Sequence, residues 1–166
     1  EALCAVGDKI GADVPLCIKG GTLYSITSGD MITAECDTNC VFVCIYPDFT
    51  LSTAEAYAKY DENPTEINPH YADFVSSIVC GSLSEGTGFI SNVFTEIYHD
   101  SRIEEMKNDL LESGAVISEM TGSGSVVFGV FENDETADDA KNILSGKYPH
   151  VFTTRPVNCG VYVLER

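Results

Sequence analysis

The sequence is poor in basic residues. Its 166 residues include nine Lys and Arg against 26 Asp and Glu, which gives a formal net charge of −17. Nucleic acids and anionic membrane surfaces attract proteins through patches of basic side chains. We therefore expect neither a nucleic-acid nor a membrane partner. An anionic ligand would have to be held by backbone N–H groups and helix ends more than by Lys and Arg.

Long apolar runs are missing as well. A run such as VFVCIY at residues 41–46 is far below the ~20 residues that a helix needs to cross a bilayer. The first residues lack the basic and then apolar pattern of a secretory signal. The hydrophobic content of 44% is typical of a globular protein, and we predict a cytoplasmic one.

The sequence lacks the usual patterns of disulfide frameworks and metal sites. Its seven cysteines, an odd number, lie mostly among apolar residues, which is typical of reduced thiols. Cys36, Cys40 and Cys44 are evenly spaced, but they lead into an apolar segment with a strand pattern, and no histidine is near them. Zinc ligands usually come as two separate close pairs. We predict no metal site built from these side chains.

Familiar catalytic motifs are also absent. The chain has no G-x-S-x-G elbow, no lysine-bearing P-loop and no dinucleotide-binding fingerprint. It does have TGSGS at residues 121–125, between two apolar segments. By itself this stretch is typical of a hairpin turn. Because glycines also let a backbone approach a phosphate closely, the local pattern leaves both interpretations open.

The order of periodic segments predicts an α+β protein. Apolar residues recur at helical spacing in some segments, and β-branched and aromatic residues cluster in others. We predict helices at 2–10, 52–62, 71–81, 90–98, 103–115 and 134–146, and strands at 16–26, 41–46, 115–120, 126–132 and 150–157. A strand pair, a crossover helix and a further strand at the end of the chain predict a layered lobe.

Several segments taken together resemble the GHMP family of small-molecule kinases. They are IGADVP and KGGT (10–15 and 19–22), PDFTLSTAEAY (47–57), NVF (92–94), MK through GA (106–115), MTGSG (120–124) and TRPV (154–157). They follow the family's order over nearly the whole chain. The resemblance implies an α+β, GHMP-kinase-like fold. Residues 1–50 would be the remnant of an N-terminal lobe like domain 2 of ribosomal protein S5, and residues 51–166 the ferredoxin-like C-terminal domain.

The resemblance also implies a reaction and the residues that perform it. The reaction is an ATP-dependent, Mg²⁺-assisted phosphoryl transfer to a hydroxyl, which needs a group to accept the proton. The GADVP match gives this role to Asp13. The STAEAY match implies that Tyr57 stacks on the base of the substrate and that Thr53 helps to orient the same end. The MTGSG match implies a loop that lies close to the phosphates, made of Thr121, Gly122, Ser123 and Gly124.

Within the family, GADVP and Tyr57 favour a kinase whose substrate is a cytidine diphosphate-linked methylerythritol. Its 2-hydroxyl would be phosphorylated in the non-mevalonate pathway of isoprenoid biosynthesis. Two alternatives stay open. One is another GHMP kinase with a different acceptor, and the other is a non-catalytic ferredoxin-like binding module.

Two features of the family have no match in the sequence: its main glycine-rich ATP loop and the lysine that partners the catalytic aspartate. We therefore expect the C-terminal part of such a kinase, with little or no kinase activity on its own. We also expect exposed apolar surface on the strands at 16–26 and 41–46, where further strands should pair, unless self-association covers it.

Overall fold

A computed structural model describes residues 2–24, 32–34, 39–64, 73 and 83–162. Its internal contacts divide the chain into two units. One comprises residues 1–38 and 156–166, and the other residues 39–155. Across the described part of the chain, every helix is too short or too polar to span a bilayer.

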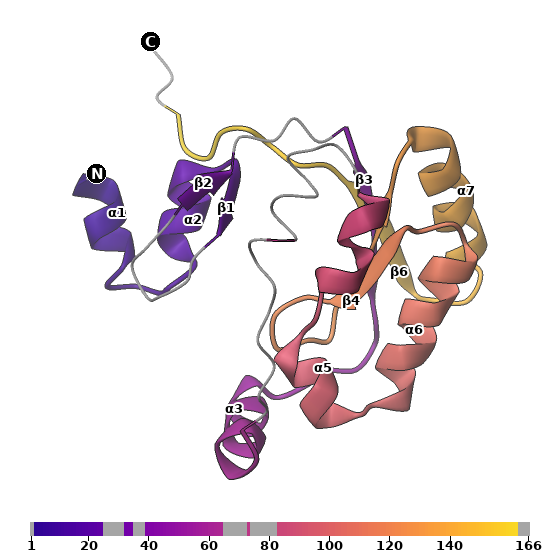
Figure 1. Ribbon diagram of the computed structural model, residues 1–166, viewed down its shortest axis with the longest axis horizontal. Helices are drawn as coiled ribbons and strands as arrows, with labels where there is room; N and C mark the ends of the chain where they lie inside the picture. Colours follow the sequence, from indigo (N-terminus) through magenta and orange to yellow (C-terminus); the bar gives the residue numbers. More distant parts are fainter. Residues whose placement is uncertain (1, 25–31, 35–38, 65–72, 74–82, 163–166) are drawn as a thin grey trace. The chain divides into compact units, whose positions relative to one another are not determined.

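The described residues of the first unit form two short helices and a two-stranded antiparallel ribbon. The helices are α1 (Ala2–Gly7) and α2 (Val14–Lys19), and the strands are β1 (Thr22–Tyr24) and β2 (Ile32–Ala34) (Figure 1). A helix at the start of the chain is thus confirmed, although it ends at Gly7. The segment after β6 joins this unit, because the N–H of Gly160 donates to the carbonyl of Lys19 (3.2 Å).

The predicted strand at 16–26 is wrong in its first half, because residues 14–19 are helical. Pro15 lies in the first turn of α2, where backbone N–H groups have no acceptor within the helix. The lack of an N–H in proline therefore costs nothing there, and its fixed φ suits the helix. The helix ends at Gly20, which has a φ of +69°. Only the remainder of the segment is extended, as β1. Helix signals at Pro15 and Gly20 therefore outweigh the apolar composition of Leu16–Ile18.

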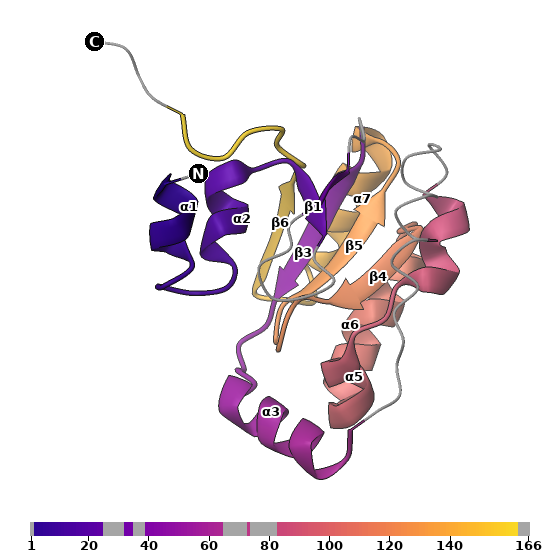
Figure 2. The same ribbon diagram turned by 60° about the vertical axis from the view of Figure 1, so that its left-hand side comes forward.

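The second unit is built on a four-stranded antiparallel sheet. Its strands are β3 (Val41–Tyr46), β4 (Ile117–Met120), β5 (Val127–Phe131) and β6 (His150–Thr154), in the order β4-β5-β3-β6 (Figure 2). β3 is followed by helices, then by the β4–β5 hairpin, helix α7 (Asp134–Leu144) and β6. This order and connectivity are those of the ferredoxin-like fold. The predicted layered lobe is confirmed.

Helices α6 (Ser101–Glu112) and α7 cover one face of this sheet (Figure 1). The residues of β3 alternate between buried and partly exposed, so every second side chain faces these helices. The core between the two layers is apolar and includes Val41, Val43, Ile45, Ile103, Met106, Leu110, Phe131, Ala137, Ala140 and Leu144.

The predicted pairing of β3 is also wrong. An unpaired edge was expected at residues 41–46, but β3 is an inner strand with β5 on one side and β6 on the other. Its hydrogen-bonding edges are therefore both occupied by the chain itself. By its contacts β3 groups with the second unit. The predicted division of the family domains at residue 50 stays a prediction.

In the part of the chain that the structure describes, further helical segments lie between β3 and α6. They are α3 (Thr53–Glu62), the 3-10 helix η1 (Ser84–Phe89) and α5 (Val93–Tyr98). The predicted helix at 52–62 is confirmed, with Ser52 as its N-cap accepting from the N–H of Glu55 (3.3 Å). The predicted helix at 90–98 is shorter and begins after Asn92. The predicted helix at 71–81 falls outside the described residues, apart from residue 73.

Candidate functional site

The glycine-rich loop joins β4 to β5, so the hairpin interpretation of TGSGS is confirmed. The turn is closed by hydrogen bonds from the N–H of Thr121 to the carbonyl of Val126 (2.9 Å) and from the N–H of Gly124 to the carbonyl of Thr121 (3.0 Å). Gly122 and Gly124 have φ values of +55° and +89°. These left-handed conformations explain why glycine occupies both positions.

The two glycines differ in their surroundings. A Cβ atom at Gly124 would lie 2.7 Å from Sδ of Met120 and 2.8 Å from Cδ1 of Leu51, so the loop is packed closely there. At Gly122 no atom of the described residues, its chain neighbours aside, would lie within 4 Å of an added Cβ. The loop is thus anchored at Gly124 and open at Gly122, where a ligand can approach the backbone.

Asn92 fastens the loop to the start of α5. Its Nδ2 atom donates to the carbonyl oxygens of Met120 (2.7 Å) and Gly122 (2.8 Å). Its Oδ1 atom accepts from the N–H of Phe94 (2.9 Å) and so caps the helix. The NVF match in the sequence includes this residue, but nothing in the sequence indicated that it contacts the loop.

Glu119, just before the loop, is a buried carboxylate with only 7% of its surface exposed. Its Oε1 atom accepts from the N–H of Met120 (2.8 Å) and from the hydroxyl of Thr95 (2.8 Å). Its Oε2 atom pairs with Nζ of Lys107 at 3.2 Å. Glu119 was not among the residues predicted from the sequence. The signal was present, because Glu119 occupies the same register in the strand as buried Ile117.

Helix α3 brings the predicted substrate-binding residues to the same region. The hydroxyl oxygens of Thr53 and Ser123 are 2.8 Å apart. Tyr57 lies one turn further along the same face of α3. Its ring meets that of Phe94 edge-on, with centroids 5.1 Å apart, yet 56% of the residue remains exposed. Thr53, Tyr57 and the loop are therefore brought together within the second unit.

The segment that enters α3 is held on several sides. The hydroxyl of Ser125 donates to the carbonyl of Phe49 (2.6 Å). The guanidinium of Arg102 lies over the ring of Phe49, 3.8 Å from its centroid, and pairs with Asp100 (2.6 Å). The hydrogen bond from Arg102 keeps the pKa of Asp100 below its ordinary value. These contacts fix the position from which Thr53 reaches the loop.

Asp13, the predicted catalytic base, belongs to the first unit. It precedes α2 at the N-cap position, but its side chain makes no capping hydrogen bond. The residue is exposed to solvent. A carboxylate with this placement is free to accept a hydrogen bond from a ligand. The catalytic role of Asp13 stays a prediction.

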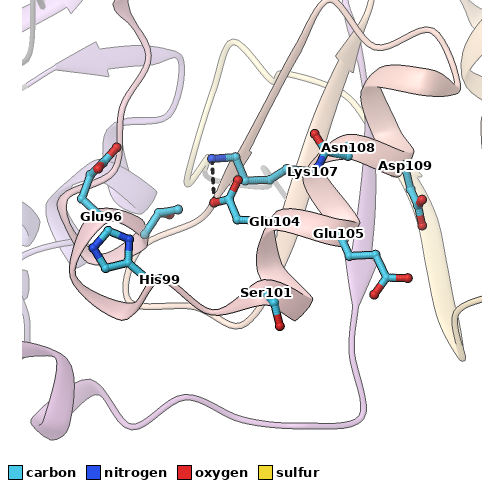
Figure 3. Close-up of a pocket in the computed structure, with 9 residues that line it drawn as sticks. Glu96, His99, Ser101, Glu104, Glu105, Lys107, Asn108 and Asp109 are labelled. Atoms are coloured by element: carbon cyan, nitrogen blue, oxygen red, sulfur yellow. Dashed lines mark hydrogen bonds and ion pairs between the residues drawn. The ribbon is translucent and has the colours of Figure 1, made fainter.

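A surface hollow lies elsewhere in the second unit, along α5 and α6 (Figure 3). It is lined by Thr95, Glu96, His99, Ser101, Glu104, Glu105, Lys107, Asn108 and Asp109. None of the predicted site residues is among them. Because carboxylates outnumber cations in this lining, the hollow is unsuited to a phosphate group. Its Thr95 and Lys107 instead contribute to the hydrogen bonds that hold Glu119.

The residues present fit ATP and Mg²⁺ in different ways. For a nucleotide phosphate, the loop offers an open backbone at Gly122 beside the hydroxyls of Ser123 and Thr53. For a metal ion, the described residues include no group of three or more His, Cys, Asp or Glu side chains; Cys36 lies outside them. Magnesium in phosphoryl-transfer sites is commonly held by the phosphates and one or two carboxylates, so a preformed protein cage is not required.

Sequence comparison relates the chain to known kinases. Residues 96–150 match the family model described as GHMP kinases C terminal. A curated relative from Caldanaerobacter subterraneus, named 4-diphosphocytidyl-2-C-methyl-D-erythritol kinase, is 31% identical over 161 residues, which cover 96% of this chain and 56% of the relative. A relative of the same name from Clostridium perfringens is 33% identical over 163 residues, which cover 95% of this chain and 57% of the relative.

Solved structures share the fold. One, described as 4-(cytidine 5'-diphospho)-2C-methyl-D-erythritol kinase, superimposes with a TM-score of 0.70 at 18% identity, covering 91% of this chain and 55% of that one. A homoserine kinase from Cytophaga hutchinsonii gives a TM-score of 0.68 at 19% identity, covering 89% of this chain and 52% of that one. At 18% and 19% identity, these two structures show that the ferredoxin-like fold is shared.

The chain is similar to the GHMP kinases, over residues 96–150 to the model of their C-terminal part and over nearly all of its length to these curated relatives. It spans little more than half the length of the curated relatives that it matches.

Proposed function

We propose that the chain is part of an ATP-dependent kinase that phosphorylates the 2-hydroxyl of 4-diphosphocytidyl-2-C-methyl-D-erythritol, a step of non-mevalonate isoprenoid biosynthesis. The observation that supports this most is the identity of 31% and 33% to two relatives of that name, extending over 96% and 95% of this chain. Such similarity over nearly every described element is more specific than a shared fold.

In the proposed reaction Asp13 accepts the proton of the substrate hydroxyl. The hydroxyl oxygen forms a bond to the γ-phosphorus as the bond between that phosphorus and the bridging oxygen breaks, and ADP leaves with the electron pair. An ionised carboxylate suffices as the base, because the proton need only leave as the new bond forms. Mg²⁺ bound to the phosphates would supply neutralisation of their charge.

The second unit supplies positioning in this proposal. The open backbone at Gly122 and the hydroxyl of Ser123 face the phosphates, where N–H groups and hydroxyls can serve in place of scarce cations. The exposed ring of Tyr57 stacks on the cytosine base, a contact worth about 1 to 3 kcal/mol. Thr53 is held next to Ser123 and orients the same end of the substrate.

The direct test is release of ADP by the complete gene product that contains this sequence. With ATP, Mg²⁺ and 4-diphosphocytidyl-2-C-methyl-D-erythritol, release should depend on the substrate and fall by roughly 10²-fold to 10⁴-fold in Asp13→Asn. Asp8→Asn, which removes another exposed carboxylate of the first unit, should leave the rate unchanged.

Two results would count against the proposal. Release that is supported by homoserine but not by the cytidine-containing substrate would show that the acceptor is wrong. A rate that survives in Asp13→Asn would show that the base is wrong.

A further inference from the structure

Asn92 is placed so that its side-chain amide can adopt only one orientation. Two of its three neighbours are carbonyl oxygens, those of Met120 and Gly122, which only accept hydrogen bonds. The third is the N–H of Phe94, which only donates. The amide nitrogen must therefore face the loop, and the amide oxygen must face the helix. Both N–H bonds of the nitrogen are used, one for each carbonyl.

This arrangement fixes the direction of the next amide in the loop. In a trans peptide unit the C=O and the N–H point in opposite directions. With the carbonyl of Gly122 directed at Asn92, the N–H of Ser123 points away from it. The equivalent N–H after Met120, that of Thr121, is bonded to the carbonyl of Val126. The N–H of Ser123 has no partner within the described part of the chain.

Hydroxyl groups lie close to the free N–H of Ser123. It belongs to the residue whose hydroxyl meets that of Thr53 at 2.8 Å. The preceding residue is Gly122, where the backbone is open to an approaching group. The N–H of Ser123 is therefore available to an anion at the part of the loop that a ligand can reach, in a chain with few basic side chains to attract one.

We propose that Asn92 is the positioning residue of the loop, which orients its peptide planes so that the N–H of Ser123 donates to a phosphate oxygen of the bound nucleotide. This inference rests on the proposed function and adds a residue to it. Aspartate would not replace Asn92 here. Its carboxylate would face two carbonyl oxygens without a proton to share, while its other oxygen would still cap α5.

The variant Asn92→Asp tests this with little disturbance of the helix. Its matched control is Asn133→Asp, because Asn133 caps α7 in the same way, accepting from the N–H of Thr136 (3.0 Å), and has no bond to the loop. Both variants keep a capping oxygen, so both should retain the thermal stability of α5 and α7. Only the first should release the loop.

The measurements are hydrogen exchange of the loop peptide 119–126 and calorimetric titration with ADP, both on the complete gene product. Without ligand, the loop peptide should exchange roughly tenfold faster in Asn92→Asp and at the normal rate in Asn133→Asp. ADP should slow this exchange in the unaltered protein, and its affinity should fall about tenfold or more in Asn92→Asp alone.

Equal ADP affinity in the two variants would overturn the proposal. So would a loop whose exchange ADP does not slow in the unaltered protein. In either case the ADP-release assay still decides the kinase function by itself, so a failure of this inference can be told apart from a failure of the proposed function.

Discussion

The hydroxyl oxygens of Thr53 and Ser123 lie 2.8 Å apart, although the residues are separated by 70 positions in the sequence. The contact joins the first turn of α3 to the glycine loop between β4 and β5. The helix that carries Tyr57 and the loop proposed to face the phosphates are thus connected directly. A substitution at Thr53 should therefore alter the effect of a substitution at Ser123, and the reverse.

A double-mutant cycle measures the strength of this connection. We expect Thr53→Val and Ser123→Ala to be non-additive in the free energy of unfolding by about 0.5 to 1 kcal/mol, because an exposed neutral hydrogen bond is worth about that much. Urea unfolding of the parent, the two single variants and the double variant gives the coupling. Strict additivity would mean that the hydroxyls do not stabilise each other.

The two loop glycines should respond differently to alanine. Gly124→Ala should reduce the free energy of unfolding by about 2 to 4 kcal/mol, because the added methyl meets Met120 and Leu51 and the φ is positive. Gly122→Ala should cost about 1 kcal/mol, since it has only the conformational penalty. Urea unfolding compares them, and equal losses would contradict the close packing at Gly124.

Glu119 should matter more for stability than its size suggests. Glu119→Gln weakens the charged acceptor of the Met120 N–H and the Thr95 hydroxyl and leaves Lys107 with a less favourable partner. We expect a loss of about 1 to 3 kcal/mol in the free energy of unfolding. The control is Glu104→Gln, which removes the other, half-exposed partner of Lys107 and should cost less than about 1 kcal/mol. A control that costs as much as Glu119→Gln would contradict this ranking.

Asp100 should make the stability dependent on pH in the acidic range. Its pKa in the folded state is lowered, chiefly by the hydrogen bond from Arg102. A lowered pKa stabilises the fold at pH values above the unfolded value of about 3.9, and this contribution is lost as the pH falls through the folded value.

Asp100→Asn should therefore be less stable than the parent at pH 6, with the difference shrinking below about pH 4. Urea unfolding at several pH values measures this difference. Asp138→Asn, on the exposed face of α7, serves as the control for loss of a carboxylate. A difference between Asp100→Asn and the parent that stays constant down to pH 3 would exclude the ion pair as its cause.

Tyr57 should affect ligand binding more than folding, because more than half of its surface is exposed. Tyr57→Ala should weaken binding of the cytidine-containing substrate by about 1 to 3 kcal/mol, while Tyr57→Phe retains a stacking face and most of the affinity. Calorimetric titration of the complete gene product measures both. Similar losses in the two variants would indicate that the hydroxyl of Tyr57, and not its ring, contacts the substrate.

Local patterns in the sequence were enough to predict much of the fold. The β-branched and aromatic residues at 41–46, the Ser52 cap and the turn at 121–125 each determine a structure within a few residues of themselves. The central place of β3 could not be predicted, because its partners β5 and β6 come from the far end of the chain. Pairing of strands distant in sequence leaves little trace in either strand alone.

Some residues of the candidate site could likewise be predicted from the sequence, and others could not. The TGSGS stretch is visible as a motif, and the family resemblance pointed to Thr53 and Tyr57. From the sequence, Asn92 can be interpreted only as a helix cap. Its two hydrogen bonds to the loop are seen in the structure alone. A side chain that acts on a distant backbone carbonyl has no sequence spacing that would predict it.

The position of β3 has a consequence for how the second unit assembles. Ile45 pairs with Val127, and Tyr46 pairs with His150, so this inner strand of the sheet is synthesised long before either of its neighbours. During synthesis β3 has no pairing partners until the β4–β5 hairpin and β6 have emerged from the ribosome. Because such distant contacts carry a large entropic cost of closure, folding of the sheet should be slow and should finish only after β6 has been synthesised.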